Sequence, residues 1–228
     1  MSGAKRIWAD VYELGGAYLT DPKDCAVFMI VNSLGEVIMI DCGAGPSATL
    51  ILRMIQDTGF DPKKIVALVL THGHIDHIGG AAAIKKASGC KIIAHELDAD
   101  AIEGRNMNKT AAQWYGLEYE PVKIDDVLKG DYESRKFGDI ELHLLHTPGH
   151  TPGSISAYLD RRDKRILFGQ DIHGPFDANT FGSNEEHWRL SMRKLQALNA
   201  DILCEGHFGV YQGRDNVQRY IEHYLESM

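Results

Sequence analysis

The chain has 228 residues, with 24 Lys and Arg against 32 Asp and Glu, which gives a formal net charge of −8. Charged residues make up 25% and hydrophobic residues 44%, and this composition is typical of a globular protein. The length predicts one domain that spans residues 1–228. The acidic balance disfavours nucleic acid as a partner, since nucleic-acid binding depends on clustered Lys and Arg.

Further classes are disfavoured by what the chain lacks. No apolar run approaches the roughly 20 residues of a membrane span, so we expect no membrane partner. Residues 1–10 contain no continuous apolar block, so no signal peptide is expected. The cysteines show no C-x-x-C spacing and favour reduced thiols in the cytoplasm. They are Cys25, Cys42, Cys90 and Cys204.

Short apolar runs alternate with amphipathic segments along the chain. The runs predict strands, in chain order, at Cys25–Val31, Val37–Ile40, Ile65–Leu70, Lys91–Ala94, Ile140–Leu145, Ser154–Leu159, Arg165–Phe168 and Ile202–Cys204. Continuous runs such as Ile65–Leu70 are typical of strands that are covered on both faces. Strands interleaved with helices predict a layered α/β domain.

Three amphipathic segments predict helices. The first carries an apolar stripe from Leu50 to Ile55, with Pro46 as its first helical residue. The second follows Ser183, which we expect to cap it. The third ends the chain, with Asp215 as its expected N-cap.

Residues 98–120 fit this alternation poorly. They carry aromatic side chains among polar ones and predict a helical insertion. Two interpretations remain open: a surface insertion, or a lid whose aromatic side chains shape a substrate pocket. The aromatics Phe176, Phe181, Phe208 and Tyr211 pose the same choice between the pocket and the core.

Four potential metal ligands lie within six positions directly after the predicted strand Ile65–Leu70. They are His72, His74, Asp76 and His77. Imidazole nitrogens and carboxylate oxygens are ligands of zinc and similar divalent metals, and a loop can turn such side chains toward one point. Gly73 and the pair Gly79 and Gly80 permit close backbone approach. The spacing therefore indicates a metal site.

Further motifs follow other predicted strands. They are Asp41-Cys-Gly43, His146-Thr-Pro-Gly-His-Thr-Pro-Gly-Ser154, Phe168-Gly-Gln-Asp171 and Cys204-Glu-Gly-His207. Together with His-x-His-x-Asp-His, this order resembles the metallo-β-lactamase superfamily over nearly the whole chain. The resemblance implies an αββα four-layer sandwich of two mixed β-sheets flanked by helices.

The resemblance also implies a dinuclear metal centre. One metal would be held by His72, His74 and His150, and a second by Asp76, His77 and His207. Asp171 would bridge the two, and Asp41 would orient a ligand. The cofactors would be two divalent ions, with zinc preferred and iron or manganese also compatible.

We interpret the chain as a metal-dependent hydrolase in which a metal-bridging hydroxide attacks an ester, thioester, lactone or related small substrate. Asp76, Asp171 and His173 are the predicted catalytic residues. Asp76 would accept a proton, whereas His173 would protonate the leaving group or contact the substrate. The remaining histidines, His95, His143, His146, His187 and His223, are expected not to bind metal.

Alternatives stay open within the same fold. One is an iron-dependent redox enzyme similar to persulfide dioxygenases, and another is a phosphodiesterase. Glyoxalase II enzymes carry a substantial domain after the last ligand, whereas little chain follows His207 here. Acyl-homoserine lactonases place a Tyr shortly after the bridging Asp, where this chain has Gly174. The expected partner is a small-molecule substrate, and a homo-oligomer is also compatible with the sequence.

Overall fold

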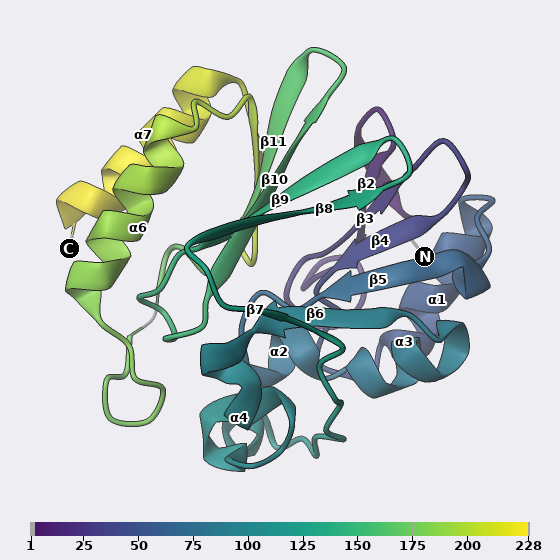
Figure 1. Cartoon of the computed structure of the whole chain (residues 1–228), viewed down its shortest axis with the longest axis horizontal. Coiled ribbons are helices and arrows are strands. Elements are labelled where there is room, and N and C mark those ends of the chain that lie inside the picture. The colour runs from purple at the N-terminus through teal and green to yellow at the C-terminus, as the bar shows by residue number, and fades with distance from the viewer. Residues whose placement is uncertain (1–2, 175, 228) are drawn as a thin grey trace.

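The structure is a computed structural model that describes residues 3–174 and 176–227. Two β-sheets lie face to face, and helices cover their outer faces (Figure 1). The predicted four-layer sandwich of two mixed sheets is therefore confirmed.

The first sheet has seven strands in chain order. They are β1 (Lys5–Trp8), β2 (Val11–Gly15), β3 (Val27–Val31), β4 (Val37–Ile40), β5 (Ile65–Val69), β6 (Lys91–His95) and β7 (Asp126–Leu128). Strands β1 to β4 pair antiparallel, whereas β4 to β7 run parallel.

The second sheet has six strands in the order β13-β12-β11-β10-β9-β8. They are β8 (Tyr132–Phe137), β9 (Ile140–His146), β10 (Ile155–Arg161), β11 (Lys164–Gln170), β12 (Ile202–Glu205) and β13 (Val210–Gln212). Only β11 and β12 pair in parallel.

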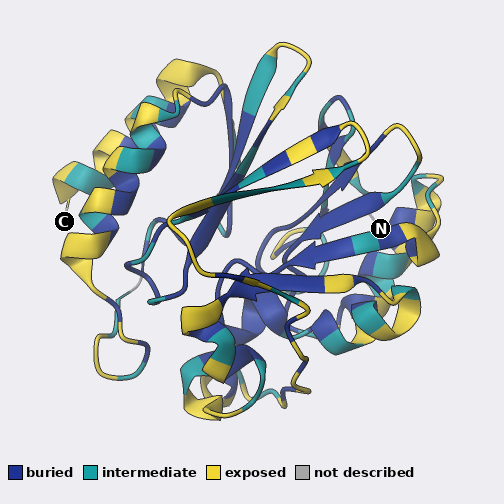
Figure 2. Ribbon diagram, in the orientation of Figure 1, coloured by how far each residue is buried: buried dark blue, intermediate teal, exposed yellow. Residues whose placement is uncertain are grey.

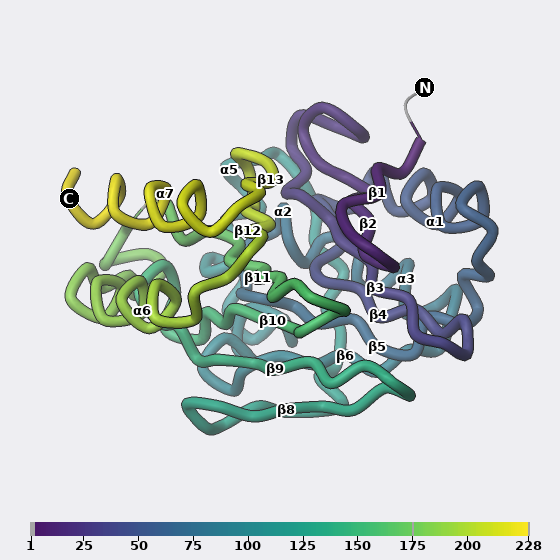
Figure 3. The backbone as a smooth tube through the Cα atoms, turned by 90° about the horizontal axis from the view of Figure 1, so that it is seen from above, coloured from purple at the N-terminus to yellow at the C-terminus, as the bar shows by residue number. Residues whose placement is uncertain are grey.

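Helices cover the outer face of each sheet. They are α1 (Ala48–Asp57), α2 (Ile75–Ile78), α3 (Ala81–Ser88), α4 (Ala99–Ile102), α5 (Ala112–Tyr115), α6 (Glu185–Ala197) and α7 (Arg214–Ser227), with 3-10 turns at Pro62–Lys64, Glu96–Asp98 and Met107–Thr110. Figure 3 shows α6 and α7 side by side along the second sheet. No helix among residues 3–174 and 176–227 is both long and apolar enough to cross a membrane.

Strand alternation builds the core. In β3, Phe28 and Ile30 face the second sheet, whereas Met29 packs toward α1 and α3. Phe28 meets Phe168 of β11 with ring centroids 5.5 Å apart, which joins the two sheets. A third cluster packs α6 and α7 against β11 and β12. Buried residues consequently fill the space between all four layers (Figure 2).

The helix starts differ from the predicted ones. Helix α1 begins at Ala48, so Pro46 lies before its N-cap Ser47. The α6 cap is Asn184, whose side chain accepts the His187 N–H, while Ser183 donates to the His150 carbonyl. Asp215 lies inside the first turn of α7. Neighbouring polar residues compete for each cap, and spacing alone does not decide between them.

Candidate metal centre

The candidate ligands come together at one edge of the sandwich, where strands β5, β9, β11 and β12 end. His72 and His74 lie in the loop after β5, and Asp171 follows β11 directly. His150 lies four residues beyond β9, and His207 two residues beyond β12. The structure thus brings all seven predicted ligands together, although they span more than half of the chain.

The first group of donor atoms surrounds one oxygen of Asp171. His74 Nδ1 lies 3.1 Å from His72 Nε2 and 2.9 Å from His150 Nε2. Asp171 Oδ2 lies 3.9 Å from His72 Nε2 and 3.5 Å from His150 Nε2. All four side chains are buried.

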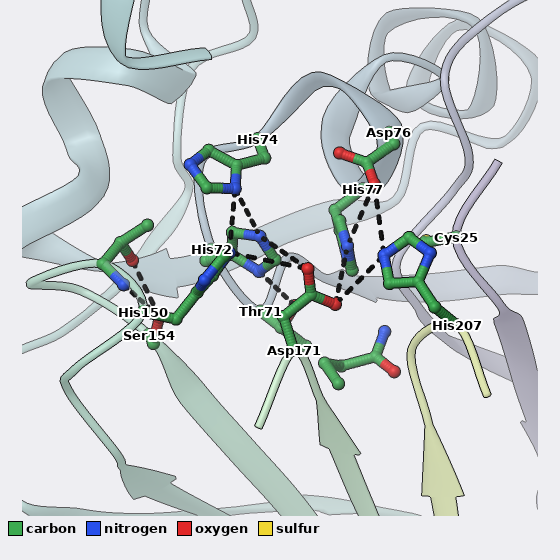
Figure 4. A network of polar contacts seen from close by, with 12 residues as sticks. Cys25, Thr71, His72, His74, Asp76, His77, His150, Ser154, Asp171 and His207 are labelled. Atoms are coloured by element: carbon green, nitrogen blue, oxygen red, sulfur yellow. Dashed lines mark hydrogen bonds and ion pairs between the residues drawn. The ribbon is translucent and has the colours of Figure 1, made fainter. Parts of the chain in front are cut away.

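The second group surrounds the other oxygen of the same carboxylate. Asp171 Oδ1 lies 3.1 Å from His77 Nε2 and 3.3 Å from His207 Nε2. Asp76 Oδ2 lies 3.5 Å and 3.3 Å from the same two nitrogens. Figure 4 shows Asp171 between the two groups, with one oxygen toward each.

The donor spacing fits metal ions. Ligands about 2.0–2.2 Å from a tetrahedral ion lie roughly 3.3–3.6 Å from one another. A neutral imidazole has one lone-pair nitrogen and one N–H. His72 Nε2, His74 Nδ1 and His150 Nε2 therefore cannot all satisfy one another by hydrogen bonds. His77 Nε2 and Asp171 Oδ1 are buried without a hydrogen-bond partner in the described chain. A cation between these donors would satisfy them.

The charge of the two groups differs. Burial, reinforced by the neighbouring histidines, lowers the pKa of His72 well below its ordinary value and that of His74 to about 3. Burial also opposes the charged form of His207, but Asp171 and Asp76 outweigh it and raise the pKa of His207 to about 10. The first group is therefore neutral apart from Asp171, whereas the second gathers the carboxylates.

Asp41, directly after β4, holds the second group in place. Its Oδ2 lies 2.7 Å from His77 Nδ1 and accepts the Thr71 hydroxyl at 2.7 Å, while Oδ1 accepts the Thr71 N–H at 2.8 Å. Gln170 also donates its side-chain amide to Oδ2. Asp41 thus contacts the predicted ligand His77, which is the position that the expected orienting role requires.

Asp98 holds the first group, and the sequence analysis missed it. Its carboxylate accepts the Gly73 N–H at 2.9 Å, the Thr151 hydroxyl at 2.7 Å and the Gly153 N–H at 2.8 Å. It therefore joins the loop of His72 and His74 to the loop of His150. No motif surrounds Asp98 in the sequence, so only the fold reveals this role.

Glu205 is the second residue that the sequence analysis missed. Its fully buried carboxylate lies 2.6 Å from His173 Nδ1 and accepts the backbone N–H groups of His207 and Phe208 at 2.7 and 2.6 Å. Because a carboxylate only accepts, Nδ1 of His173 carries the proton and Nε2 is left for other contacts. Its place in Cys204-Glu-Gly-His207 was the available signal.

Aromatic side chains form the wall of a hollow of about 370 Å³ above the ligands. They are Trp114, Tyr115, Phe181 and Phe208, and His173 lines the same hollow. Phe176 and Tyr211 instead pack on Trp188 and Tyr220. Trp114 and Tyr115 belong to α5, so residues 98–120 do contribute to the site.

Close backbone approach supports the ligand loop. A Cβ on Gly79 would lie 2.2 Å from the Ala44 carbonyl oxygen, and one on Gly80 would lie 2.4 Å from the Cys42 carbonyl oxygen. The expectation that this glycine pair permits close packing is confirmed. Cys42 and Cys204 are buried free thiols outside both donor groups.

Comparisons with known proteins agree with this geometry. A family model described as the metallo-beta-lactamase superfamily matches residues 20–207. An uncharacterized protein of Aquifex aeolicus is 35% identical over 149 residues, which cover 65% of this chain and 64% of that protein, just under two thirds of its length. The hydroxyacylglutathione hydrolase GloC of Haemophilus influenzae is 29% identical over 173 residues, which cover 73% and 78% of the two chains.

A solved structure shares the fold. The native FEZ-1 metallo-beta-lactamase from Legionella gormanii superposes with a TM-score of 0.83, covering 99% of this chain and 94% of that one at 20% identity. At this identity the likeness concerns the arrangement of sheets and helices.

Proposed function

Because the chain belongs to the metallo-β-lactamase superfamily and is a metallohydrolase with His and Asp metal-binding groups, we propose that it holds two divalent ions and hydrolyses a small ester, thioester or lactone. One observation carries the proposal: each oxygen of Asp171 faces a separate group of three further donors.

Zinc is the preferred ion in both groups, since nitrogen and carboxylate donors at this spacing suit it. His72, His74 and His150 would hold one ion, and Asp76, His77 and His207 the other, with Asp171 shared. Bound ions would supply an acidic water and polarise the substrate carbonyl.

The remaining steps fall to side chains in the hollow. Asp76 stays ionised, because His77 and His207 outweigh its burial and lower its pKa, so it can accept a proton. We assign to His173 the transfer of a proton to the leaving group: with its Nδ1–H held by Glu205, Nε2 would first accept a proton released by the attacking water and then donate it to the leaving atom. Burial and nearby Asp76 raise the pKa of Tyr115, which therefore remains a hydroxyl donor beside the reacting groups.

The free, buried cysteines support a reducing compartment, and we propose the cytoplasm. The proposed partner is a small-molecule substrate, and neither nucleic acid nor a membrane is part of the proposal.

Elemental analysis and a substrate panel test the proposal. We expect about two zinc ions per chain in colourless protein and turnover of at least one thioester, lactone or ester that chelation stops. One iron per chain with oxygen consumption on a persulfide would overturn it, and turnover of phosphodiesters alone would do so too.

A further inference from the structure

A second hollow, of about 460 Å³, adjoins the catalytic one and differs from it in chemistry. It shares the lining residues Ala111 and Trp114 with the catalytic hollow, so the two hollows lie next to each other at these side chains. Its other lining residues are polar and uncharged: Asn106, Asn108, Gln113, Asn179 and Thr180. They come from the 3-10 turn and α5 on one side and from the segment before α6 on the other.

The side-chain amides of this second hollow are available for a ligand. Within the described chain, the side chains of Asn106, Asn108, Gln113 and Asn179 make no hydrogen bond to protein, whereas Thr180 binds Asp177. Each amide offers two donors and one acceptor. A group that both donates and accepts would match them best, and a secondary amide is such a group.

The charge of the lining residues disfavours a highly charged ligand arm. No Lys, Arg, Asp or Glu is among the described residues that line either the second hollow or the aromatic wall, apart from the metal-binding carboxylates. A glutathione arm carries two carboxylates and an ammonium group, for which this lining offers no opposite charge. These exposed neutral amides offer such an arm no ion pair, whereas they offer a neutral amide both donors and acceptors.

From this juxtaposition we infer that the substrate has an uncharged, amide-bearing arm, which lies in the hollow of Asn106, Asn108, Gln113 and Asn179 while its scissile carbonyl lies over Asp171. The inference rests on the proposed hydrolysis and names its substrate class: an ester or thioester whose second arm is neutral and amide-bearing. Trp114 stands between the two hollows and would contact the joint between arm and carbonyl.

The decisive experiment compares three thioesters of one acyl group on the zinc-loaded protein. Their thiols are N-acetylcysteamine, which carries a neutral amide, ethanethiol, which lacks it, and glutathione. We expect kcat/KM to be highest for the N-acetylcysteamine thioester. Gln113→Ala with Asn179→Ala should lower it about tenfold, as expected for two lost hydrogen bonds, and change the ethanethiol thioester less than twofold.

Two variants sharpen the comparison. Gln113→Lys should raise kcat/KM for the glutathione thioester relative to that for the N-acetylcysteamine thioester. Gln56→Ala is the matched control, because it removes an exposed amide on α1. It should leave kcat/KM unchanged for all three thioesters. Preference of the wild type for the glutathione thioester, or equal losses for all three thioesters in the double variant, would overturn the inference.

A binding measurement separates this inference from the proposed hydrolysis. Calorimetry with the non-hydrolysable thioethers S-propyl-N-acetylcysteamine and S-propylglutathione requires no turnover. We expect tighter binding of the neutral thioether and its weakening in the double variant. If no ester, thioester or lactone is hydrolysed but this binding preference is observed, only the proposed hydrolysis is refuted. Tighter binding of S-propylglutathione would overturn the inference even if hydrolysis is observed.

Discussion

The ligand loops and the aromatic wall of the same site are built in contrasting ways. The ligands follow strand ends, are mostly buried, and are held by Asp41, Asp98 and Glu205 through several hydrogen bonds each. In the wall, Trp114 and Tyr115 lie in one helical turn while Phe181 and Phe208 lie in loops, and Trp114 is 64% exposed. If the proposed function holds, this contrast predicts that changes in the ligand loops alter the reaction itself, whereas changes in the wall alter the choice of substrate.

Asp171→Ala tests the ligand loops at the one residue that belongs to both donor groups. Removing the carboxylate shared by both groups should lower zinc content and reduce kcat/KM by at least about a thousandfold. Far-UV circular dichroism should stay unchanged, because Asp171 follows a strand and its carboxylate packs in no core cluster. Full zinc content with near-normal turnover would show that the ligand assignment is wrong.

Asp41→Asn tests the support of the ligands rather than a ligand itself. The amide keeps the size of the side chain but weakens the charge-assisted contact to His77 Nδ1, so we expect a 10–100-fold loss of zinc affinity. Competition with a chromophoric chelator measures this. Thr71→Ser retains the hydroxyl partner of Asp41 and serves as the control, with affinity within about threefold of the wild type.

Trp114→Ala tests the wall. Because this indole is exposed, the free energy of unfolding should change by less than about 0.5 kcal/mol. The KM for the preferred substrate should rise about fivefold to tenfold while kcat stays within about twofold, since the side chain would contact the proposed substrate away from the metal ligands. Steady-state kinetics measure both constants. A loss mainly in kcat would show that Trp114 acts in the reaction rather than in substrate binding.

His95, at the end of β6, is expected to affect only the pH dependence of stability. Burial, with His146 stacked on it at 4.0 Å, lowers the pKa of His95 to about 4. The unfolded chain thus binds the proton first as the pH falls, so stability is lost between about pH 6.5 and 4. In chelator-treated protein, His95→Asn should flatten this part of the unfolding curve. An identical slope in both proteins would refute the assignment.

The cluster of His72, His74, Asp76 and His77 was predictable because metal ligation favours closely spaced donors, whereas the other ligands were implied by the resemblance to the metallo-β-lactamase superfamily. Strands such as Val37–Ile40 were also predictable, since both faces are buried and the apolar run is continuous. Strand β8, Tyr132–Phe137, was not expected, because this edge strand is polar and largely solvent-facing. Strands β1, β2, β7 and β13 were missed as well. Each is short and lies at or beside a sheet edge, where the apolar signal is weak.

The supports of the centre were less predictable than the ligands. Asp98 reaches Gly73 and Thr151 from a segment that has no recognisable pattern, and its role depends on three loops meeting. The second hollow was likewise not predictable, because it forms only where Asn179 and Gln113 are brought together by the fold. Local sequence spacing does not predict such contacts, because tertiary packing determines them.

Asp41 and Gln170 share one further property: both have left-handed backbone conformations, with φ of 56° and 52°. Glycine would relax either position by about 1 kcal/mol, yet it would remove a side chain that steadies His77. At Asp41 that gain is smaller than the cost of leaving the Thr71 N–H, the Thr71 hydroxyl and His77 Nδ1 without their buried acceptor. Random mutation selected only for thermal resistance should therefore retain Asp41. The strained backbone is thus stabilised by the same hydrogen bonds that orient His77, so selection for stability and selection for turnover should retain the same side chain.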